Sequence, residues 1–370
     1  MSEQITDIRH MAEAIRLARR GLCTTAPNPR VGCVIAQGER VIARGFHRRA
    51  GQAHAEVEAL RMAREPVRGA TAYVTLEPCS HHGRTPPCAE ALIEAGVARV
   101  VAASLDPNPL VAGSGLEKLR AAGIAVESGI LEREAIALNP GFFKRMRTGM
   151  PWVRVKLAMS LDGRTAMADG SSKWITAEAA RADVQRLRAQ SCAIVTGVGT
   201  VLHDDPRLDV RIATNDGATP ERQPVRVVVD SQLRMSPAAR VIGAAGDTLV
   251  ATAGRDAARE QSLADAGATV LHLPAPDGRV DLRALLAHLA AAQCNEVLIE
   301  AGATLAGAAL RAGLVDELVV YMAPTLMGSA ARPLLDLPFA SMDEKLGLQI
   351  TDITAVGRDW RITAVPVPKI

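Results

Sequence analysis

Apolar and polar positions in the first 130 residues switch between helical and strand spacing. Ile8, Met11, Ile15 and Leu22 recur at helical intervals, which predicts an opening amphipathic helix with Thr6 as its N-cap. Residues 31–47 (VGCVIAQGERVIARGFH) predict a β-hairpin that turns at residues 37 and 38. The pattern then predicts strands at residues 72–76, 98–104 and 125–129, and helices that begin at residue 54 or span residues 89–95 and 115–122. Strands that alternate with helices indicate an α/β sandwich.

A second α/β region follows a break near residue 150. The helical pattern of residues 131–147 is interrupted by Asn-Pro-Gly at residues 139–141, and Gly149 and Pro151 mark a boundary. We therefore predict two domains, residues 1–148 and 149–370. Apolar runs in the second predict a helix at residues 177–188 and strands at residues 152–160, 192–197, 225–230, 248–253, 269–273, 296–300 and 318–322.

Composition narrows the class of protein. A chain of 370 residues is longer than a single domain with one hydrophobic core usually is. Its net charge of +3 is close to neutral for this length. Aromatic residues make up only 2% and no polybasic run occurs, so we expect no nucleic-acid partner. The first 21 residues lack an apolar leader and no stretch of 18 uncharged apolar residues follows, so we expect a cytoplasmic protein without membrane contact. Cys23, Cys33, Cys192 and Cys294 have no metal-like spacing and are expected in the core.

The segments HAEVEAL and TLEPCSHHGRTPPC carry the residues for a catalytic metal site. His54, Cys79 and Cys88 offer one imidazole and two thiolates, which suit one zinc ion with an open fourth position for water. Such an ion lowers the pKa of its water to about 7. Glu56 lies two residues after His54, within reach of that water on a helical first turn, where it is the predicted general acid and base. The order H-x-E, then P-C, then Cys is typical of zinc-dependent base deaminases.

The loop between the two cysteines is longer than in most deaminases. Eight residues separate Cys79 from Cys88, whereas two are usual, so the loop must fold back. Its turn formers suit such a return, and its polar residues His81, His82 and Arg84 are candidate substrate contacts. The alternative is a structural zinc site with His81 or His82 as fourth ligand. Glu56 favours the catalytic interpretation, because a closed site has no use for it.

Two further polar residues are candidates for the deaminase pocket. Asn28 lies in the rigid loop TTAPNPRVG before the hairpin and is kept as a substrate contact, although a lone Asn is more often a turn residue. His47 ends the hairpin, where a structural and a functional role are equally compatible with the pattern.

Phosphate-binding patterns occur twice in the second domain. TGVGTV at residues 196–201 places G-x-G after a strand, and Gly302 in EAGATLAGAAL lies where a strand meets a helix. The first segment departs from the Rossmann fingerprint because Leu202 replaces its third glycine, which leaves a Rossmann dehydrogenase as second choice. Lys156, Asp204 and Glu300, each expected at or just beyond a strand end, are candidates for polar chemistry, with structural roles as the alternative.

Together these segments resemble a known family along nearly the whole chain. TTAPNPRVG, HAEVEAL, TLEPCSHHGRTPPC and SLDPNPLVAG are similar to the bifunctional riboflavin-biosynthesis deaminase/reductase family, and the long C-x8-C loop is that family's own form. The likeness continues through KLAMSLDGRTAM, SKWIT, TGVGTVLHDDPRL, VVVDSQLR and EAGATLAGAAL. It implies a cytidine-deaminase-like three-layer α/β/α domain followed by a dihydrofolate-reductase-like α/β domain.

The resemblance also implies the activities. The first domain would hydrolyse the exocyclic amine of a phosphorylated diaminopyrimidinone, and the second would reduce its ribosyl side chain with NADPH. Matching positions imply cofactor contacts at Ala158, Trp174, Thr200, Asp204, Ser231, Gly302, Ala303, Thr304, Leu305, Ala306, Gly307 and Ala308. They imply substrate contacts at Ser172, Arg188, Leu208, Arg211 and Glu300. Arg188 and Arg211 suit a phosphate because a guanidinium binds an anionic oxygen pair bidentately.

Two alternatives stay open at this point. One is a zinc deaminase of another base, nucleoside or transfer RNA with an inactive second domain; the scarcity of basic and aromatic residues argues against the RNA version. The other is a non-enzymatic assembly in which zinc stabilises the fold. The apolar run VDELVVYM suits a homo-oligomer contact and a core strand equally well, so the sequence assigns no oligomeric state.

Overall fold

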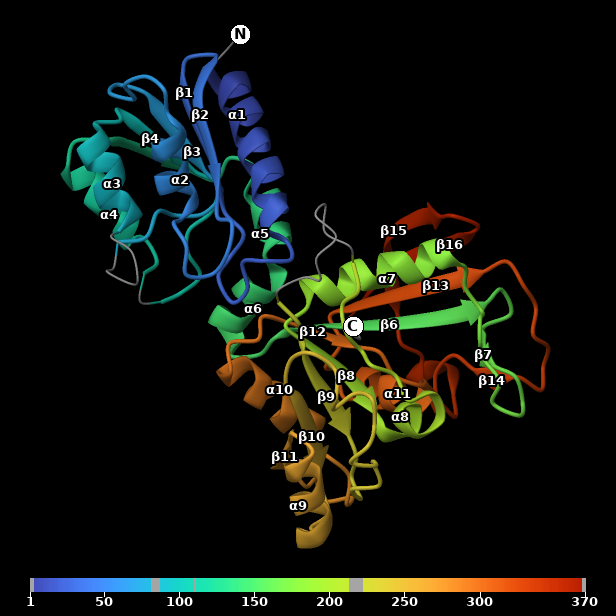
Figure 1. Ribbon diagram of the computed structural model, residues 1–370. Coiled ribbons are helices and arrows are strands. Elements are labelled where there is room, and N and C mark those ends of the chain that lie inside the picture. Colours follow the sequence, from blue (N-terminus) through green and yellow to red (C-terminus); the bar gives the residue numbers. More distant parts are fainter. Residues whose placement is uncertain (1–2, 81–86, 110, 213–221, 368–370) are drawn as a thin grey trace. The chain divides into compact units, whose positions relative to one another are not determined.

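The computed structural model describes residues 3–80, 87–109, 111–212 and 222–367. The chain divides into two compact units, Met1–Met150 and Pro151–Ile370, each of which has its own sheet (Figure 1). Among the described residues, no helix combines the length and the apolar character that crossing a bilayer requires.

The first unit contains a five-stranded sheet. Its order is β2-β1-β3-β4-β5, in which β1 runs antiparallel to β2 and β3 while β3, β4 and β5 are parallel. The strands are β1 Gly32–Gln37, β2 Arg40–Phe46, β3 Thr71–Val74, β4 Arg99–Ala102 and β5 Ala125–Ser128. The helices are α1 Glu3–Ala18, α2 Ala55–Met62, α3 Cys88–Ala95, α4 Ser114–Ala121, α5 Glu132–Leu138 and α6 Pro140–Thr148.

Helices cover both faces of this sheet. On one face Ala59, Leu92 and Leu116 bring α2, α3 and α4 into a buried cluster with the strands. On the other face Met11 of α1 and Ala135 of α5 pack in a second cluster, and Figure 1 shows the two groups of helices on opposite sides. The unit is therefore a three-layer α/β/α sandwich. The predicted N-cap is wrong, because α1 already includes Glu3, and Thr6 lies buried inside the helix.

The second unit contains a nine-stranded sheet of order β11-β10-β9-β8-β12-β6-β13-β16-β15. The strands from β11 to β13 are parallel, and the hairpin β15–β16 is added antiparallel at the β13 edge. These strands are β6 Trp152–Ser160, β8 Ala193–Gly197, β9 Val225–Val229, β10 Thr248–Thr252, β11 Ala268–His272, β12 Glu296–Ile299, β13 Glu317–Ala323, β15 Leu348–Val356 and β16 Asp359–Pro366, and a small separate sheet pairs β7 Arg164–Ala166 with β14 Arg332–Pro333.

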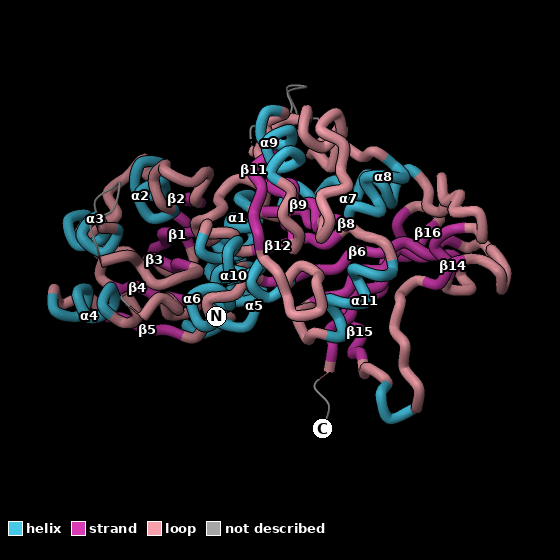
Figure 2. The backbone as a smooth tube through the Cα atoms, turned by 90° about the horizontal axis from the view of Figure 1, so that it is seen from below, coloured by secondary structure: helices cyan, strands magenta, loops and turns pink. Residues whose placement is uncertain are grey.

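Helices also lie on both sides of this larger sheet. They are α7 Glu178–Gln190, α8 Val198–Asp204, α9 Ala257–Asp265, α10 Leu282–Ala291 and α11 Ala303–Arg311. Leu187, Val201 and Leu263 place α7, α8 and α9 in one buried cluster with the central strands. Figures 1 and 2 show α10 and α11 on the opposite side of the sheet. The run VDELVVYM is largely β13, whose burial between β6 and β16 is explained within one chain.

Candidate functional sites

His54, Cys79 and Cys88 converge in the first unit, as the sequence predicts. His54 is the N-cap of α2, Cys79 follows the β3 strand, and Cys88 is the first residue of α3. The Nδ1 atom of His54 lies 3.5 Å from Cys79 Sγ and 3.3 Å from Cys88 Sγ. All three donor atoms lie within 4.8 Å of one another. The fold thus brings together an imidazole nitrogen and two sulfurs from three separate elements.

These distances fit a tetrahedral zinc ion. Bonds of about 2.3 Å to sulfur and about 2.0 Å to nitrogen place the two ligand atoms about 3.5 Å apart at a tetrahedral angle. The two nitrogen–sulfur separations, 3.5 and 3.3 Å, are close to this value. The donor set of one nitrogen and two sulfurs is also one that zinc prefers. His54, Cys79 and Cys88 would therefore hold the ion through His54 Nδ1 and the two Sγ atoms.

The surroundings of the two cysteines favour the thiolate form of Cys79. The hydrogen bond with the Cys88 side chain lowers the pKa of Cys79 to about 4, and His54 and the Cys88 N–H add to this effect. That N–H, at the start of α3, donates to Cys79 Sγ at 3.3 Å. The bond with Cys79 correspondingly raises the pKa of Cys88. These contacts favour the thiolate form of Cys79, which is the form that binds a metal.

Glu56 lies beside this ligand set and not within it. It occupies the first turn of α2, two residues after His54, and its side chain is only 3% exposed. Burial raises its pKa to about 7, and the negative charge on Cys79 adds to the shift, while His54 opposes it. A carboxyl group that changes protonation state near neutral pH is suited to carry a proton between reacting groups.

Asn28 and His47 form a chain of contacts that leads to the metal ligands. Asn28 Nδ2 lies 3.1 Å from His47 Nε2, and His47 Nδ1 lies 3.0 Å from the carbonyl oxygen of Ala53. The His47 ring also packs edge-on against His54, with 5.3 Å between the ring centroids. Both predicted residues are thus next to the cluster. The predicted contacts His81 and Arg84, and the alternative ligand His82, lie outside the described residues.

Glu77 is a buried acid of this region that the sequence pattern does not single out. It lies two residues before Cys79 and is 4% exposed. The available signal was an acidic residue between the end of an apolar strand and a proline, since carboxylates are rarely buried without a partner.

In the second unit, Lys156, Arg188 and Glu300 come together from three elements. Arg188 of α7 forms a bidentate ion pair with Glu300, at 2.6 Å from Nε to Oε1 and 2.9 Å from Nη2 to Oε2. Glu300 follows β12 directly, as predicted. The prediction that Lys156 lies at or just beyond a strand end is wrong: it lies in the middle of β6, between β12 and β13. Parallel pairing with strands distant in sequence makes this position central.

The charges of this cluster influence one another. Burial would raise the pKa of Glu300, but Arg188, Lys156 and Arg211 hold it below its ordinary value. Burial lowers the pKa of Lys156, and Arg188 adds to this while Glu300 opposes it. The site is thus a mostly buried, net cationic group of side chains, which suits an anionic ligand.

The other predicted substrate contacts lie near this cluster to different degrees. Arg188 Nη1 also donates to the Asp209 carbonyl at 3.2 Å, and Arg211 pairs with the Asp209 carboxylate at 3.3 Å. Leu208, which precedes Asp209 in the sequence, has its side chain buried in the core cluster. Ser172 is half-buried in the segment before α7.

The predicted cofactor residues occupy several segments around the carboxyl ends of the strands. Trp174 is 70% exposed and stacks under the Arg181 guanidinium, 4.6 Å from the ring centroid. Asp204 was predicted at or just beyond a strand end but is the last residue of α8, the helix that follows β8. It pairs with Lys173 at 3.4 Å, and Thr200 lies on the same helix. Ala158 is on β6 and Ser231 follows β9.

The segment that begins at Gly302 forms the start of α11. Gly302 is its N-cap, and Gly302 and Thr304 are exposed. Ala303, Leu305 and Ala308 are partly buried. Ala306 and Gly307 are buried, and a Cβ atom on Gly307 would lie 2.3 Å from the Asp336 carbonyl oxygen. The first turn therefore offers free backbone N–H groups, while Ala306 and Gly307 serve close packing.

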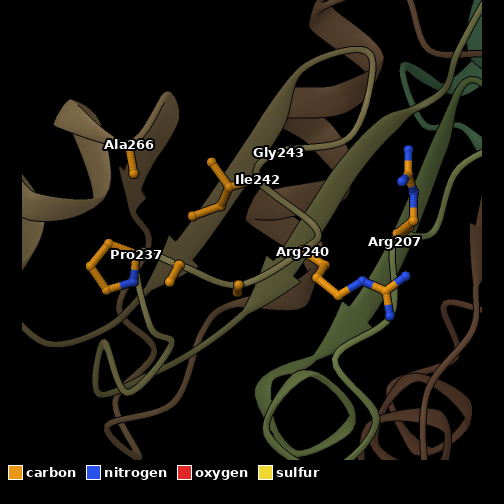
Figure 3. A pocket seen from close by; sticks show the side chains of 8 residues that line it. Arg207, Pro237, Arg240, Ile242, Gly243 and Ala266 are labelled. Carbon is orange, nitrogen blue, oxygen red and sulfur yellow. The ribbon is translucent and has the colours of Figure 1, made fainter.

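A pocket elsewhere in the second unit is separate from these candidates. Figure 3 shows Arg207 and Arg240 on one side of it and Pro237, Ile242 and Ala266 on the other. Arg207 pairs with Asp209 at 2.8 Å, and none of the predicted site residues lines the pocket. It therefore adds nothing to either candidate site.

Comparisons with known proteins match both units. A family model of the RibD C-terminal domain matches residues 151–362, and a model of the cytidine and deoxycytidylate deaminase zinc-binding region matches residues 4–104. The riboflavin biosynthesis protein RibD of Escherichia coli (strain K12) is 55% identical over 339 residues, which cover 90% of this chain and 91% of that protein. RibD of Buchnera aphidicola is 40% identical over 366 residues, with 96% and 97% covered.

Solved structures show the same likeness. RibD of Acinetobacter baumannii (form 1) superposes with a TM-score of 0.92 at 49% identity, covering 99% of this chain and 100% of that chain. A diaminohydroxyphosphoribosylaminopyrimidine deaminase/5-amino-6-(5-phosphoribosylamino)uracil reductase of Thermotoga maritima gives 0.85 at 31% identity, with 99% and 100% covered. These matches confirm the predicted cytidine-deaminase-like and dihydrofolate-reductase-like domains, in place of a Rossmann domain. The chain belongs to the RibD family of bifunctional riboflavin-biosynthesis enzymes, which join a deaminase and a reductase in one polypeptide.

Proposed function

We propose that this chain first deaminates 2,5-diamino-6-(5-phosphoribosylamino)pyrimidin-4-one and then reduces the ribosyl side chain to ribityl with NADPH. The product would be 5-amino-6-(5-phosphoribitylamino)uracil. We assign the zinc-dependent deaminase to residues 1–148 and the reductase to residues 149–370; the division of the chain after Met150 supports this assignment. We place the protein in the cytoplasm, where a reducing environment keeps Cys79 and Cys88 free to bind metal.

The observation that carries the first step is the convergence of His54, Cys79 and Cys88 with the buried Glu56 beside them. Zinc, when bound by these three ligands, supplies the Lewis acidity that makes water a nucleophile at neutral pH. Glu56 would accept a proton from the attacking water and deliver it to the departing amine, which leaves as ammonia. Asn28 and His47 would orient the pyrimidine edge, since Asn28 contacts His47 and the His47 ring packs against His54.

For the second step, the cationic cluster would hold the phosphorylated sugar. Arg188 and Arg211 suit the phosphate, and Lys156 and Glu300, which lie beside Arg188, would contact the ribosyl group. NADPH would lie along Ala158, Trp174, Thr200, Asp204 and Ser231. Its pyrophosphate would bind at the N-terminus of α11, where Gly302 leaves the backbone N–H groups accessible.

Mass spectrometry of the reaction tests both steps directly. The zinc-loaded protein is incubated with the diaminopyrimidinone ribosylamino phosphate, with and without NADPH. Replacement of the amine by oxygen should raise the substrate mass by about 1 Da, and addition of hydride and proton should raise it by about 2 Da more. An unchanged mass would contradict the substrate assignment, and a 1 Da shift alone would contradict the reductase assignment.

Removal of zinc should separate the two activities. Chelation is expected to abolish deamination, while reduction of the deaminated intermediate continues at the rate of the untreated protein, because the ligand set lies entirely in the first unit. Elemental analysis should find one zinc per chain before chelation, and readdition of zinc should restore deamination. Deamination that survives a metal-free preparation would rule out the catalytic zinc.

A further inference from the structure

The carboxylate of Glu77 accepts four backbone hydrogen bonds from a single later segment. Its Oε2 accepts from the N–H of Asp106 at 3.1 Å and of Gly113 at 2.9 Å. Its Oε1 accepts from the N–H of Gly115 at 2.8 Å and of Leu116 at 3.4 Å. Glu77 is thus bound to both ends of the connection between β4 and α4.

No cationic side chain among the described residues pairs with this buried carboxylate. Its negative charge is stabilised instead by backbone N–H groups, two of them in the first turn of α4, where the helix dipole adds a favourable field. If these donors moved away, the buried carboxylate would be left without compensation and would destabilise the folded unit. The carboxylate and the segment therefore fix each other's position.

The segment is built for close approach to the turn that carries Cys79. A Cβ atom on Gly115 would lie 1.9 Å from the Pro78 carbonyl oxygen, so only glycine lets α4 come this near. Gly113 adopts a φ of +84°, which favours glycine as well. Next to them, the hydroxyl groups of Ser80 and Ser114 lie 2.6 Å apart. The residues on both sides of Cys79 are thus in contact with the start of α4.

We propose that Glu77 is a positioning residue of the deaminase site: it clamps the Cys79 turn against α4 and thereby fixes the Cys79 sulfur as a metal ligand. Glu77 touches neither the metal ligands' donor atoms nor, in this assignment, the substrate. It acts through the backbone of residues 77–80. The inference rests on the proposed role of His54, Cys79 and Cys88 as zinc ligands.

The substitution Glu77→Gln tests the clamp with little change in volume. An amide has one acceptor oxygen, and its NH₂ group would face N–H donors, so two of the four hydrogen bonds are lost. Loss of an outer-shell partner of a metal site costs about 10- to 100-fold in metal affinity. We expect at least a tenfold weaker zinc affinity in chelator competition on the full chain, and a similar fall in kcat/KM for deamination.

Asp7→Asn is the matched control. Asp7 is also a buried acid of the first unit, but it lies on α1, on the other face of the sheet, where it accepts from Tyr73 at 2.7 Å and pairs with Arg99. This variant should lose thermal stability and keep its zinc affinity. Reductase activity, measured on the same chains, should stay within a factor of two for both variants.

The outcomes separate the clamp from general destabilisation. Wild-type zinc affinity in Glu77→Gln, or equal losses in both variants, would overturn the proposal. If Glu77→Gln does not fold, Gly115→Ala decides, because it pushes α4 away from Pro78 while Glu77 itself is unchanged. Unchanged zinc affinity in this variant overturns the clamp, and a loss supports it. A wild-type chain that binds no zinc would instead refute the metal site itself.

Discussion

Glu56→Gln is expected to bind zinc as the wild type does and to deaminate about 10²- to 10⁴-fold more slowly, the range for loss of a positioned general acid and base. Glutamine has nearly the same volume as glutamate, and the side chain it replaces lies beside the ligands and is not one of them. The change therefore removes proton transfer and leaves the metal site in place. Single-turnover rates of ammonia release and the zinc content of the purified variant would measure the two effects.

A neighbour on the same helix provides the control for this substitution. Glu58 lies on α2 as well, but it is partly exposed and pairs with two largely exposed arginines, Arg48 at 3.2 Å and Arg61 at 3.3 Å. Glu58→Gln should deaminate within a factor of two of the wild type, since exposed ion pairs contribute little. A Glu56→Gln protein as active as Glu58→Gln would remove Glu56 from the mechanism.

Arg188→Ala is expected to abolish reduction and to destabilise the second unit by about 3 kcal/mol. This value is the lower end of the range for a broken buried ion pair, because the positive charge of Lys156 still stabilises Glu300. The substitution leaves the Glu300 carboxylate buried without its bidentate partner. It also removes a candidate phosphate ligand. Urea unfolding followed by circular dichroism and steady-state reduction of the deaminated intermediate would measure the two losses.

Arg186→Ala is the comparison for Arg188→Ala. Arg186 is on the same helix but largely exposed, and it pairs with Asp183 at 3.6 Å. Its removal should change the unfolding free energy by less than about 0.5 kcal/mol. Deamination should be unaffected in both variants. Wild-type stability in Arg188→Ala would show that the Glu300 charge is compensated by other groups.

The metal-binding residues could be predicted because they lie in two short segments with characteristic spacing. His54 and Glu56 are two residues apart, and Cys79 and Cys88 flank a loop between a recognisable strand and helix. Zinc chemistry restricts which residues serve as ligands, so few arrangements were possible. The side chains of the described residues converge as expected, whereas the contacts assigned to His81 and Arg84 remain predictions.

The reductase cluster was harder to predict because its members are distant in sequence. Lys156, Arg188 and Glu300 meet only because β12 pairs with β6 and α7 packs over the same sheet. Strand order of this kind depends on long-range packing and is not encoded in periodicity. Residues 348–366 were missed as strands since β15 is largely exposed and lacks clear alternation of apolar and polar positions.

The contact between His47 and the Ala53 carbonyl determines which hydrogen-bonding groups the Asn28 side chain can recognise. A carbonyl only accepts, so His47 Nδ1 carries the proton, and burial, which lowers the pKa of His47, keeps the ring neutral with Nε2 as an acceptor. Asn28 must then donate through Nδ2, which leaves its Oδ1 as an acceptor for any ligand. In the proposed deaminase site, the tautomer of one imidazole would thus make Asn28 select donor groups of the substrate. Because a main-chain oxygen enforces that tautomer, a side-chain substitution at position 53 would leave the selectivity in place.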